Sequence, residues 1–373
     1  DDKTIDLFES QYLVPNGISY NSYLIVDEKV AIMDTVDKRK TDEWLENLDR
    51  ELNGRTPDYL VISHLEPDHA SNIKVVSEKY PSMKLVGNAK TFSMLPQFFP
   101  DFDFADKTVT VKEGDELELG SHKLTFIMAP MVHWPEVMVS YESAEKVLFS
   151  ADGFGTFGAL DAQEDDWACE ARRYYFNICG KYGVQVQNLL KKAAKLDIRK
   201  ICPLHGPVLD ENLGWYIGLY DTWSKYEPET DGVFIAYCSV HGNTAKAAEK
   251  LCEIIKSKTD KKVSIADLSR TDLAEDIEDA FRFSRMVVIA PSYDGVFPIM
   301  NDFLHHLKIK GYKNRKVAMV ENGSWAPSAA KTMRTYLEEM KNVEICPTVV
   351  TIRSAMKEEN IPQLEQLSDE ILG

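Results

Sequence analysis

Six consecutive residues, from position 64 to position 69, carry four side chains that could bind a metal ion. They are His64, Glu66, Asp68 and His69. The run directly follows the apolar segment Tyr59–Ser63, which we expect to be a buried strand. A loop at the end of a strand can turn alternate side chains inward and so form a metal site. The alternative is a solvated, charged loop before a helix, with Asp68 or Ser71 as the helix cap.

Three further potential ligands occupy the same kind of position in the sequence. They are His133, Asp152 and His205, each of which follows an apolar segment and has a proline or glycine close by. A single histidine of this kind is often structural, but repetition at several strand ends favours one shared metal site. We interpret His122, in a turn, and His305 and His306, in an expected helix, as structural residues.

The segments that must position these residues alternate between strand and helix patterns. Strands are expected at Tyr23–Val26, Val30–Met33 and Lys123–Ala129, and helices at Arg39–Leu52 and Cys169–Ala194. Short apolar runs between turns, with helical periodicity among them, are typical of sheets flanked by helices. The first part of the chain is therefore expected to be an α/β or α+β structure with two layers of sheet.

The pattern changes after the polar, turn-rich segment Tyr226–Gly232. From Gly232–Tyr237 to Ile361–Leu372, strands alternate regularly with helices. Such alternation predicts a parallel, doubly wound sheet. We therefore expect two domains, residues 1–228 and residues 229–373.

Three loops at expected strand ends of the second domain suit a phosphate-bearing, flat-ringed cofactor. The first runs from Cys238 to Thr244 into a helix, where hydroxyls and free amides can bind an anion. The other two, Pro291–Asp294 and Asn322–Ala326, combine small polar residues with an aromatic one. The alternatives are an ordinary strand-to-helix turn and, for Tyr293 and Trp325, aromatic residues that pack between helices.

The seven potential metal ligands resemble the pattern of the metallo-β-lactamase superfamily. Glu66 departs from the zinc-binding members, most of which carry histidine there, and resembles the flavodiiron proteins. Mixed carboxylates and imidazoles are a harder ligand set, which suits non-haem iron. The resemblance implies an αββα sandwich in which His64, Glu66 and His133 hold one iron and Asp68, His69 and His205 hold the other. It also implies that Asp152 bridges the two iron ions.

The second domain resembles flavodoxin, whose fold binds FMN at the switch point of a parallel sheet. The resemblance implies phosphate contacts from Ser239, Val240, His241, Gly242, Asn243 and Thr244. It implies contacts to the isoalloxazine ring from Pro291, Ser292, Tyr293 and Asp294, and from Asn322, Gly323, Ser324, Trp325 and Ala326. His241 replaces a more usual small hydroxyl residue, so only the role of its backbone is carried over.

A flavodoxin domain behind a carboxylate-rich metallo-β-lactamase domain is the flavodiiron arrangement, and it implies an oxidoreductase. FMN stores two electrons and a di-ferrous pair stores two more. Four electrons reduce dioxygen to two waters, and two electrons couple two nitric oxide molecules into nitrous oxide. Family members that act on either gas share these ligands; we expect dioxygen detoxification, with nitric oxide reduction as the alternative.

Three other functions remain open from the residues. The first is a zinc hydrolase of the metallo-β-lactamase fold, against which Glu66 and the flavodoxin-like domain argue. The second is a pure electron-transfer flavoprotein, which would not need seven metal ligands. The third is a redox sensor or an interaction protein, for which an additional regulatory segment would be expected.

A glycine pattern after one strand could be mistaken for a nicotinamide site. Gly153, Gly155 and Gly158 match G-x-G-x-x-G, but such a fingerprint opens a helix. The following residues, 159–166, show no apolar helical stripe. We expect the glycines to allow a tight turn beside Asp152 instead.

Composition restricts the partners. The formal net charge of −17 argues against nucleic acid and anionic membranes, and no apolar run is long enough to span a bilayer. The first residues lack the order of a signal peptide, and the six cysteines are widely spaced, as expected of reduced thiols in a cytoplasmic protein. The given sequence contains no Cys-x-x-Cys pair, which a fused rubredoxin-like module would need. A separate donor such as rubredoxin is therefore expected to supply electrons.

The resemblance also implies a head-to-tail homodimer, or a dimer of dimers, that places the flavin of one subunit near the irons of the other. We expect Trp134 or Glu136, which closely follow the ligand His133 in sequence, to help bridge that gap or tune the site. Asn16, Tyr20, Tyr174 and Tyr175 are candidates for the residues around the ligands that set the choice of gas.

Overall fold

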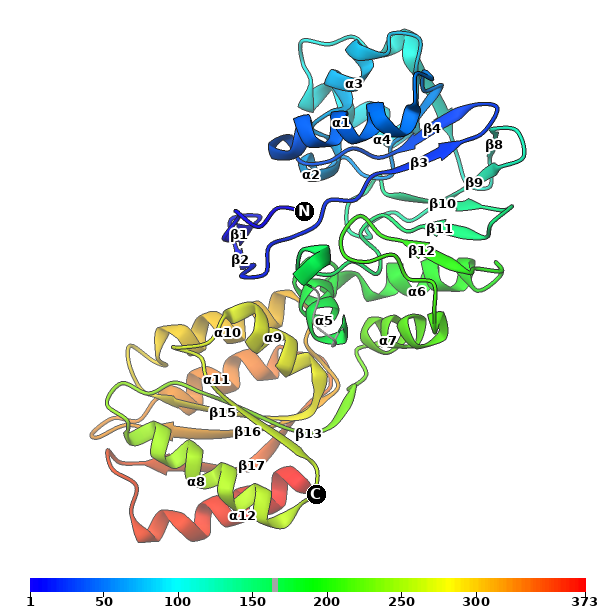
Figure 1. The fold of residues 1–373 in the computed structure, drawn as a ribbon. Helices are drawn as coiled ribbons and strands as arrows, with labels where there is room; N and C mark the ends of the chain where they lie inside the picture. The colour runs from blue at the N-terminus through cyan, green and yellow to red at the C-terminus, as the bar shows by residue number, and fades with distance from the viewer. Residues whose placement is uncertain (163–166) are drawn as a thin grey trace. The chain divides into compact units, whose positions relative to one another are not determined.

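The computed structural model describes residues 1–162 and 167–373. They form two compact units, Asp1–Asp221 and Thr222–Gly373, whose elements are labelled in Figure 1. Helix α7 (Leu213–Lys225) carries the chain from the first unit into the second. The predicted domain boundary after residue 228 lies just beyond the end of this helix.

The first unit contains two five-stranded sheets. The first has the spatial order β3 (Tyr23–Val26), β4 (Val30–Met33), β5 (Tyr59–Val61), β6 (Lys84–Asn88) and β7 (Thr108–Val111). The second has the order β12 (Lys200–Cys202), β11 (Val147–Phe149), β10 (Met138–Glu142), β9 (Lys123–Met128) and β8 (Glu116–Glu118). A short hairpin of β1 (Leu7–Phe8) and β2 (Tyr12–Leu13) precedes both sheets.

Helices cover the outer faces of these sheets (Figure 1). On the first sheet they are α1 (Thr41–Leu52), α2 (Pro67–Ala70), α3 (Ile73–Lys79) and α4 (Ala89–Phe98). On the second they are α5 (Trp167–Ile178), α6 (Gly183–Ala193) and α7. Trp44 and Leu48 of α1 pack on the outer face of the first sheet. Between the sheets, Val61 packs in one core with Phe126 and Phe149. The predicted αββα sandwich is confirmed.

Four connections at strand ends carry the predicted ligands. Strand β5 lies between two parallel neighbours and leads into the loop before α2. Strands β11 and β12 are also parallel to each other, so their carboxyl ends meet at one edge of the second sheet. The fourth connection joins β9 to β10, which is an antiparallel pair. The topology therefore collects side chains that are far apart in sequence.

The expected helix over Cys169–Ala194 is wrong in its continuity. The chain forms α5, then a turn of 3₁₀ helix at Gly180–Tyr182, and then α6. Glycines at positions 180 and 183 interrupt the helix because glycine is the weakest helix former apart from proline. Buried residues continue across the interruption, since most of α5 and Val186 of α6 are buried.

The second unit is one parallel sheet with helices on both faces. Its strands have the order β14 (Lys262–Asp267), β13 (Thr230–Tyr237), β15 (Phe283–Pro291), β16 (Arg315–Asn322) and β17 (Val343–Ile352). The helices are α8 (Asn243–Lys258), α9 (Leu273–Arg282), α10 (Pro298–Ile309), α11 (Ala329–Glu338) and α12 (Ile361–Leu372). Helices α8 and α12 lie on one face and the other three on the opposite face (Figure 1). This strand order, 2-1-3-4-5, is that of flavodoxin, and the predicted doubly wound sheet is confirmed.

Neither unit contains a candidate membrane span. Across the described ranges, no helix combines the length and the hydropathy that crossing a bilayer requires.

A buried carboxyl group in the second unit gives a prediction about stability. Asp276 is 3% exposed and accepts a hydrogen bond from the hydroxyl of Thr271. Burial raises its pKa from 3.8 to about 7. Between about pH 4 and pH 7, Asp276 therefore keeps its proton in the folded chain but has lost it in the unfolded chain. The free energy of unfolding falls as pH rises through this range, by up to ~1.4 kcal/mol per pH unit.

We expect Asp276→Asn to remove this pH dependence. In urea unfolding of the intact protein, the stability of the variant relative to an Asp260→Asn control should increase from pH 5 to pH 7. Asp260 is an exposed aspartate of the same unit, so the control makes the same chemical change at the surface. Parallel profiles for the two variants would contradict the assignment.

Candidate functional site

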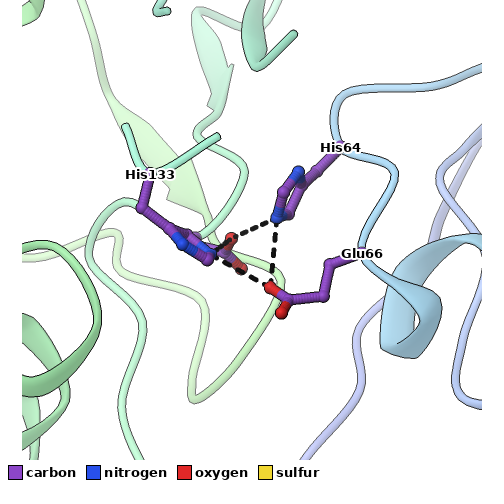
Figure 2. Close-up of side chains that lie close together, drawn as sticks. His64, Glu66 and His133 are labelled. Carbon is purple, nitrogen blue, oxygen red and sulfur yellow. Dashed lines mark hydrogen bonds and ion pairs between the residues drawn. The ribbon is translucent and has the colours of Figure 1, made fainter. Parts of the chain in front are cut away.

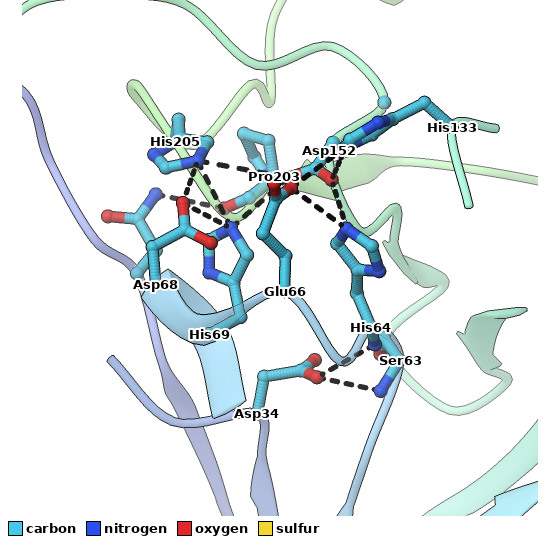
Figure 3. A network of polar contacts seen from close by, with 12 residues as sticks. Asp34, Ser63, His64, Glu66, Asp68, His69, His133, Asp152, Pro203 and His205 are labelled. Carbon is cyan, nitrogen blue, oxygen red and sulfur yellow. Dashed lines mark hydrogen bonds and ion pairs between the residues drawn. The ribbon is translucent and has the colours of Figure 1, made fainter. Parts of the chain in front are cut away.

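The structure brings all seven predicted ligands together in the first unit (Figure 3). They form two groups in which the candidate ligand atoms lie within 4.8 Å of one another. The first group is His64, Glu66, His133 and Asp152; the second is Asp68, His69 and His205. The loops after β5, β9, β11 and β12 supply these side chains.

In the first group, two imidazoles face two carboxylates (Figure 2). Oε2 of Glu66 lies 3.2 Å from Nε2 of His64 and 3.0 Å from Nε2 of His133. Oδ2 of Asp152 lies 3.4 Å and 3.3 Å from the same two nitrogens. The four ligand atoms therefore surround one point.

The second group has the same character. Oδ2 of Asp68 lies 3.3 Å from Nε2 of His69 and 3.2 Å from Nε2 of His205. The two histidine nitrogens are 3.1 Å apart. Short helix α2 fixes Asp68 and His69, because Pro67 begins it and the amide of His69 donates to the carbonyl of Glu66 at 2.9 Å.

Asp152 lies between the two groups and presents one oxygen to each. Its Oδ2 faces the first group, whereas its Oδ1 lies 3.2 Å from Nε2 of His69 and 3.8 Å from Nε2 of His205. The side chain is 1% exposed. A carboxylate placed in this way can bridge two ions.

The distances within the groups match those expected around metal ions. Two ligand atoms that each lie about 2.1 Å from one ion are about 3.0 Å apart at a right angle and about 3.4 Å apart at a tetrahedral angle. In the described residues, the carboxylate oxygens of Asp68 and Asp152 and Nε2 of His133 are buried without a hydrogen-bond partner. Such orphaned polar atoms are costly unless an ion satisfies them. The residues present therefore fit two metal ions.

The electrostatics of the cluster favour a positive charge at its centre. Burial acts to raise the pKa of Asp152, but His64 and His133 outweigh it and hold this pKa well below the ordinary range. Burial acts to lower the pKa of His64, but Asp152, Glu136 and Glu66 raise it well above the ordinary range. The carboxylates of Asp152 and Glu66 are therefore ionised at neutral pH, the form in which carboxylates bind metal ions.

Hydrogen bonds to the other ring nitrogens orient two of the histidines. Nδ1 of His64 lies 2.8 Å from Oε1 of Glu136, and this oxygen also accepts from the amide of Leu65 at 2.9 Å. Nδ1 of His205 lies 2.7 Å from the carbonyl oxygen of Ser19. Such partners fix the ring so that Nε2 points to the metal.

A third interaction holds the loop that follows β5. Asp34 accepts from the amide of Ser63 at 2.7 Å (Figure 3). Burial raises the pKa of Asp34 to about 6. The sequence analysis identified Glu136 as a candidate neighbour of the site but missed Asp34 and Ser19.

Three of the other candidate neighbours lie against the rings of candidate ligands. The ring of Trp134 lies edge-on to His64, with centroids 5.1 Å apart. Tyr20 and Tyr174 lie 5.8 Å and 5.5 Å from the ring of His205. Tyr175 instead packs on Tyr220, and the carbonyl of Asn16 accepts from Ala159. The structure also places Phe8, which the sequence analysis missed, 5.3 Å from His205.

The glycine pattern after β11 forms turns, as expected. The amides of Gly153 and Gly155 donate to the carbonyls of Ser150 and Asp152, both at 3.0 Å. A Cβ at Gly155 would lie 3.0 Å from the carbonyl oxygen of Asp152, so a side chain there would crowd the candidate ligand. Part of the segment 159–166, on which the expected lack of a helical stripe was based, lies outside the described residues.

The three histidines that we interpreted as structural contact residues outside the cluster. Nδ1 of His122 lies 2.8 Å from Asp27, and Nε2 of His306 lies 3.6 Å from Asp302 of its own helix. The ring of His305 contacts His306.

The second unit contains a cavity of about 710 Å³ at the carboxyl ends of β13, β15 and β16. Thirteen of the fifteen residues predicted to bind the flavin line it. They are Val240, His241, Asn243, Thr244, Pro291, Ser292, Tyr293, Asp294, Asn322, Gly323, Ser324, Trp325 and Ala326. The other two, Ser239 and Gly242, shape the first loop: Oγ of Ser239 accepts from the amides of Gly242 and Ala245 at 3.1 Å and 3.2 Å.

Two residues of this cavity were missed from the sequence. They are Ser328, which precedes α11, and Ser354, which follows β17. The carbonyl of Ser354 accepts from the side chain of Asn322 at 2.9 Å, which joins two of the loops. Applying the strand-end argument to the fifth strand would have found Ser354.

Two aromatic residues on the walls of this cavity are mostly exposed to solvent. Trp325 is 89% exposed and Tyr293 is 56% exposed. Neither ring is buried between helices, so the alternative of packing aromatics is not supported. Exposed rings on the walls of a cavity this large suit a flat ligand that would cover them.

Comparison with known proteins places this chain among others of the same architecture. The family model described as "ODP family beta lactamase" matches residues 18–206. A nitric oxide reductase of Moorella thermoacetica is 29% identical over 95% of this chain and 90% of its own length. An anaerobic nitric oxide reductase flavorubredoxin of Vibrio vulnificus is also 29% identical, over 90% of this chain and 69% of its own length.

A solved structure agrees over almost the whole chain. The rubredoxin oxygen:oxidoreductase of Desulfovibrio gigas superposes with a TM-score of 0.90 at 26% sequence identity. The match covers 98% of this chain and 92% of the other.

Proposed function

Because this chain belongs to the family described as "ODP family beta lactamase" and is similar along nearly its whole length to flavodiiron proteins, we propose that it is a flavodiiron oxidoreductase. It reduces dioxygen to water, or nitric oxide to nitrous oxide, at a non-haem di-iron site with electrons relayed by FMN. The observation that carries the proposal is the placement of Asp152, which presents one oxygen to each of two ligand groups.

The proposed ligand sets follow the two groups. His64, Glu66 and His133 hold one iron, and Asp68, His69 and His205 hold the other, with Asp152 between them. Two irons held by these residues would supply electrons and bind dioxygen or nitric oxide. The protein's part is to fix the ligand atoms: Glu136 and the carbonyl of Ser19 orient the histidines.

FMN is proposed for the cavity of the second unit. Asn243 and Thr244, at the start of α8, would hold its phosphate, because they line the cavity and the helix dipole favours an anion. Tyr293 and Trp325, which line the same cavity, would contact its ring. FMN supplies one electron at a time from a two-electron store, which matches the needs of a di-iron site.

A carboxylate in the first ligand group and a flavin cavity both argue against a zinc hydrolase. Nitric oxide reduction as the main activity is the stronger alternative, because two of the similar proteins are named nitric oxide reductases. We retain dioxygen as the proposed main substrate, since the similar solved structure is named an oxygen oxidoreductase.

We further propose the partners expected from the resemblance. A separate protein such as rubredoxin donates electrons, and the chain acts in the cytoplasm. A head-to-tail homodimer, or a dimer of such dimers, places the flavin of one copy near the metal cluster of the other.

The first experiment is to measure consumption of dioxygen and of nitric oxide by one preparation with one artificial electron donor, together with its iron and FMN content. Rapid loss of dioxygen without peroxide, and slow loss of nitric oxide, would identify an oxygen reductase. The reverse would identify a nitric oxide reductase. Iron and FMN present without consumption of either gas would refute the proposal.

Replacing Glu136 with Gln tests how the cluster is supported. We expect iron affinity and turnover to fall by ~10–100-fold, because the neutral amide weakens the hydrogen bond that orients His64. Iron retained after titration with a chelator measures the affinity, and steady-state gas consumption measures turnover.

Glu142→Gln is the matched control for this prediction. Glu142 is also buried, at 2% exposure, and accepts from backbone amides, but it lies in the β10–β11 turn region rather than at the cluster. A second test replaces Trp134 and Glu136 together; unchanged turnover in that variant would exclude the expected tuning role of both residues.

A further inference from the structure

Two adjoining apolar cavities lie in the first unit between helices α6 and α7 and the second sheet. The outer cavity has a volume of about 150 Å³ and the inner one about 20 Å³. Four residues line both, namely Leu148, Phe154, Leu190 and Ala193. Because the same side chains form a wall of each cavity, the two cavities adjoin at these four residues.

The outer cavity begins near the protein surface. Its remaining walls are Ala194, Leu196, Ile198, Ile201 and Ile217. Ala194 is exposed and Leu196 is half-buried, whereas Ile201 is fully buried. All nine lining residues are apolar. The cavity therefore leads inward from α6 and α7 along an entirely apolar wall.

The inner cavity lies against the backbone that carries two candidate ligands. Its lining includes Val132, which precedes His133, and Gly153, which follows Asp152. Its two hydroxyl groups are already engaged: Ser150 donates to the carbonyl of Gly153 at 2.6 Å, and Tyr220 accepts from the amide of Phe154 at 2.6 Å. An apolar cavity with satisfied hydroxyls stays dry and takes up apolar atoms or molecules such as xenon.

Phe154 is one of the residues that line both cavities. Its backbone has a φ of 66°, in the left-handed region that disfavours a bulky side chain. Tyr220 holds it there through the hydrogen bond to its amide and through ring stacking, with centroids 4.2 Å apart. Locally strained backbone that its surroundings maintain is characteristic of functional positions.

We propose that these two cavities form the path by which an uncharged diatomic gas reaches the metal cluster. The proposal rests on the proposed function, which requires such a gas. The polar side of the cluster is distinct: the side chain of Glu66 is 18% exposed and that of His133 is 10% exposed. That side suits water and protons, whereas the apolar path admits dioxygen or nitric oxide and excludes ions.

The first test is to collect diffraction data from crystals of the holoprotein under xenon pressure. We expect a xenon peak bounded by Leu148, Phe154, Leu190 and Ala193, and its loss in Ala193→Phe. An empty cavity in the parent protein would overturn the proposal. This readout does not depend on activity, so it separates failure of the path from failure of the proposed function.

The second test measures the second-order rate constant of the reduced holoprotein with dioxygen and with nitric oxide. For Ala193→Phe we expect a decrease of about tenfold or more, with iron content, FMN content and turnover at saturating gas retained. Val184→Phe, which adds the same ring at a position on α6 that is 68% exposed, is the matched control. Equal rate constants for the two variants would exclude the path even if xenon binds.

A second blocking variant covers the case in which Ala193→Phe does not fold. Leu196→Trp narrows the outer cavity from a half-buried position and should give the same loss of rate. If the parent protein consumes neither gas, the proposed function fails, and the path fails with it whatever the xenon result.

Discussion

Replacing Asp152 with Asn is expected to lower turnover by at least about 100-fold and to reduce the bound iron well below two ions per chain. Each oxygen of Asp152 faces a different ligand group, at 3.3 Å and 3.4 Å on one side and 3.2 Å on the other. An amide has one oxygen, so its nitrogen would face either one group or the other. The buried cluster would then lose one of the three carboxylate charges that offset two cations.

The measurements are iron content after desalting and steady-state consumption of gas. Asp27→Asn is the matched control, because Oδ2 of Asp27 also contacts a histidine, His122, at 2.8 Å but lies away from the cluster. We expect the control to retain both iron ions and full turnover. An Asp152→Asn protein with normal iron and normal turnover would show that the two groups do not share a bridging carboxylate.

The arrangement of the metal cluster could be inferred from the sequence because its ligands follow recognisable strands. His64, Asp152 and His205 each come within four residues of the end of a short apolar strand. Strands β11 and β12 are parallel, so their carboxyl ends meet at one edge of the second sheet and bring Asp152 and His205 close. His64 follows β5 of the first sheet and reaches them because the two sheets pack face to face.

The residues that support the cluster could not be inferred in this way. Glu136 contacts His64 across 72 residues of sequence, and the carbonyl of Ser19 contacts His205 across 186 residues. A backbone carbonyl has no sequence signature at all. Such contacts depend on the packing of two sheets, which hydrophobic periodicity does not specify.

The fold was predictable where apolar segments were long and less so where they were short. The parallel sheet of the second unit has central strands of eight or nine residues that are almost wholly buried, and its strand order agrees with the flavodoxin resemblance. By contrast, β7 and β8 have four and three residues and are mostly half-buried or exposed. Short, exposed strands carry little hydrophobic signal, and the sequence analysis did not identify them.

Removing the two exposed rings of the second unit is expected to weaken FMN binding strongly. Trp325→Ala and Tyr293→Ala should each raise the Kd for FMN by about tenfold, and the double variant by about 100-fold, because stacking of an aromatic side chain on a nucleobase-like ring contributes ~1–3 kcal/mol. Both side chains line the cavity and are mostly exposed, at 89% and 56%. Titration of the flavin-depleted protein with FMN, followed by flavin fluorescence, measures the Kd.

The matched control is Tyr336→Ala, which removes a half-buried ring from α11, outside the cavity walls. Its hydroxyl donates to Asn301, so the variant also tests whether loss of a surface aromatic disturbs the unit in general. We expect this control to bind FMN normally. If Trp325→Ala and Tyr293→Ala also bind FMN normally, the flavin does not lie between these rings. Because metal binding involves the other unit, iron content should stay unchanged in all these variants, and turnover should recover when excess FMN is added.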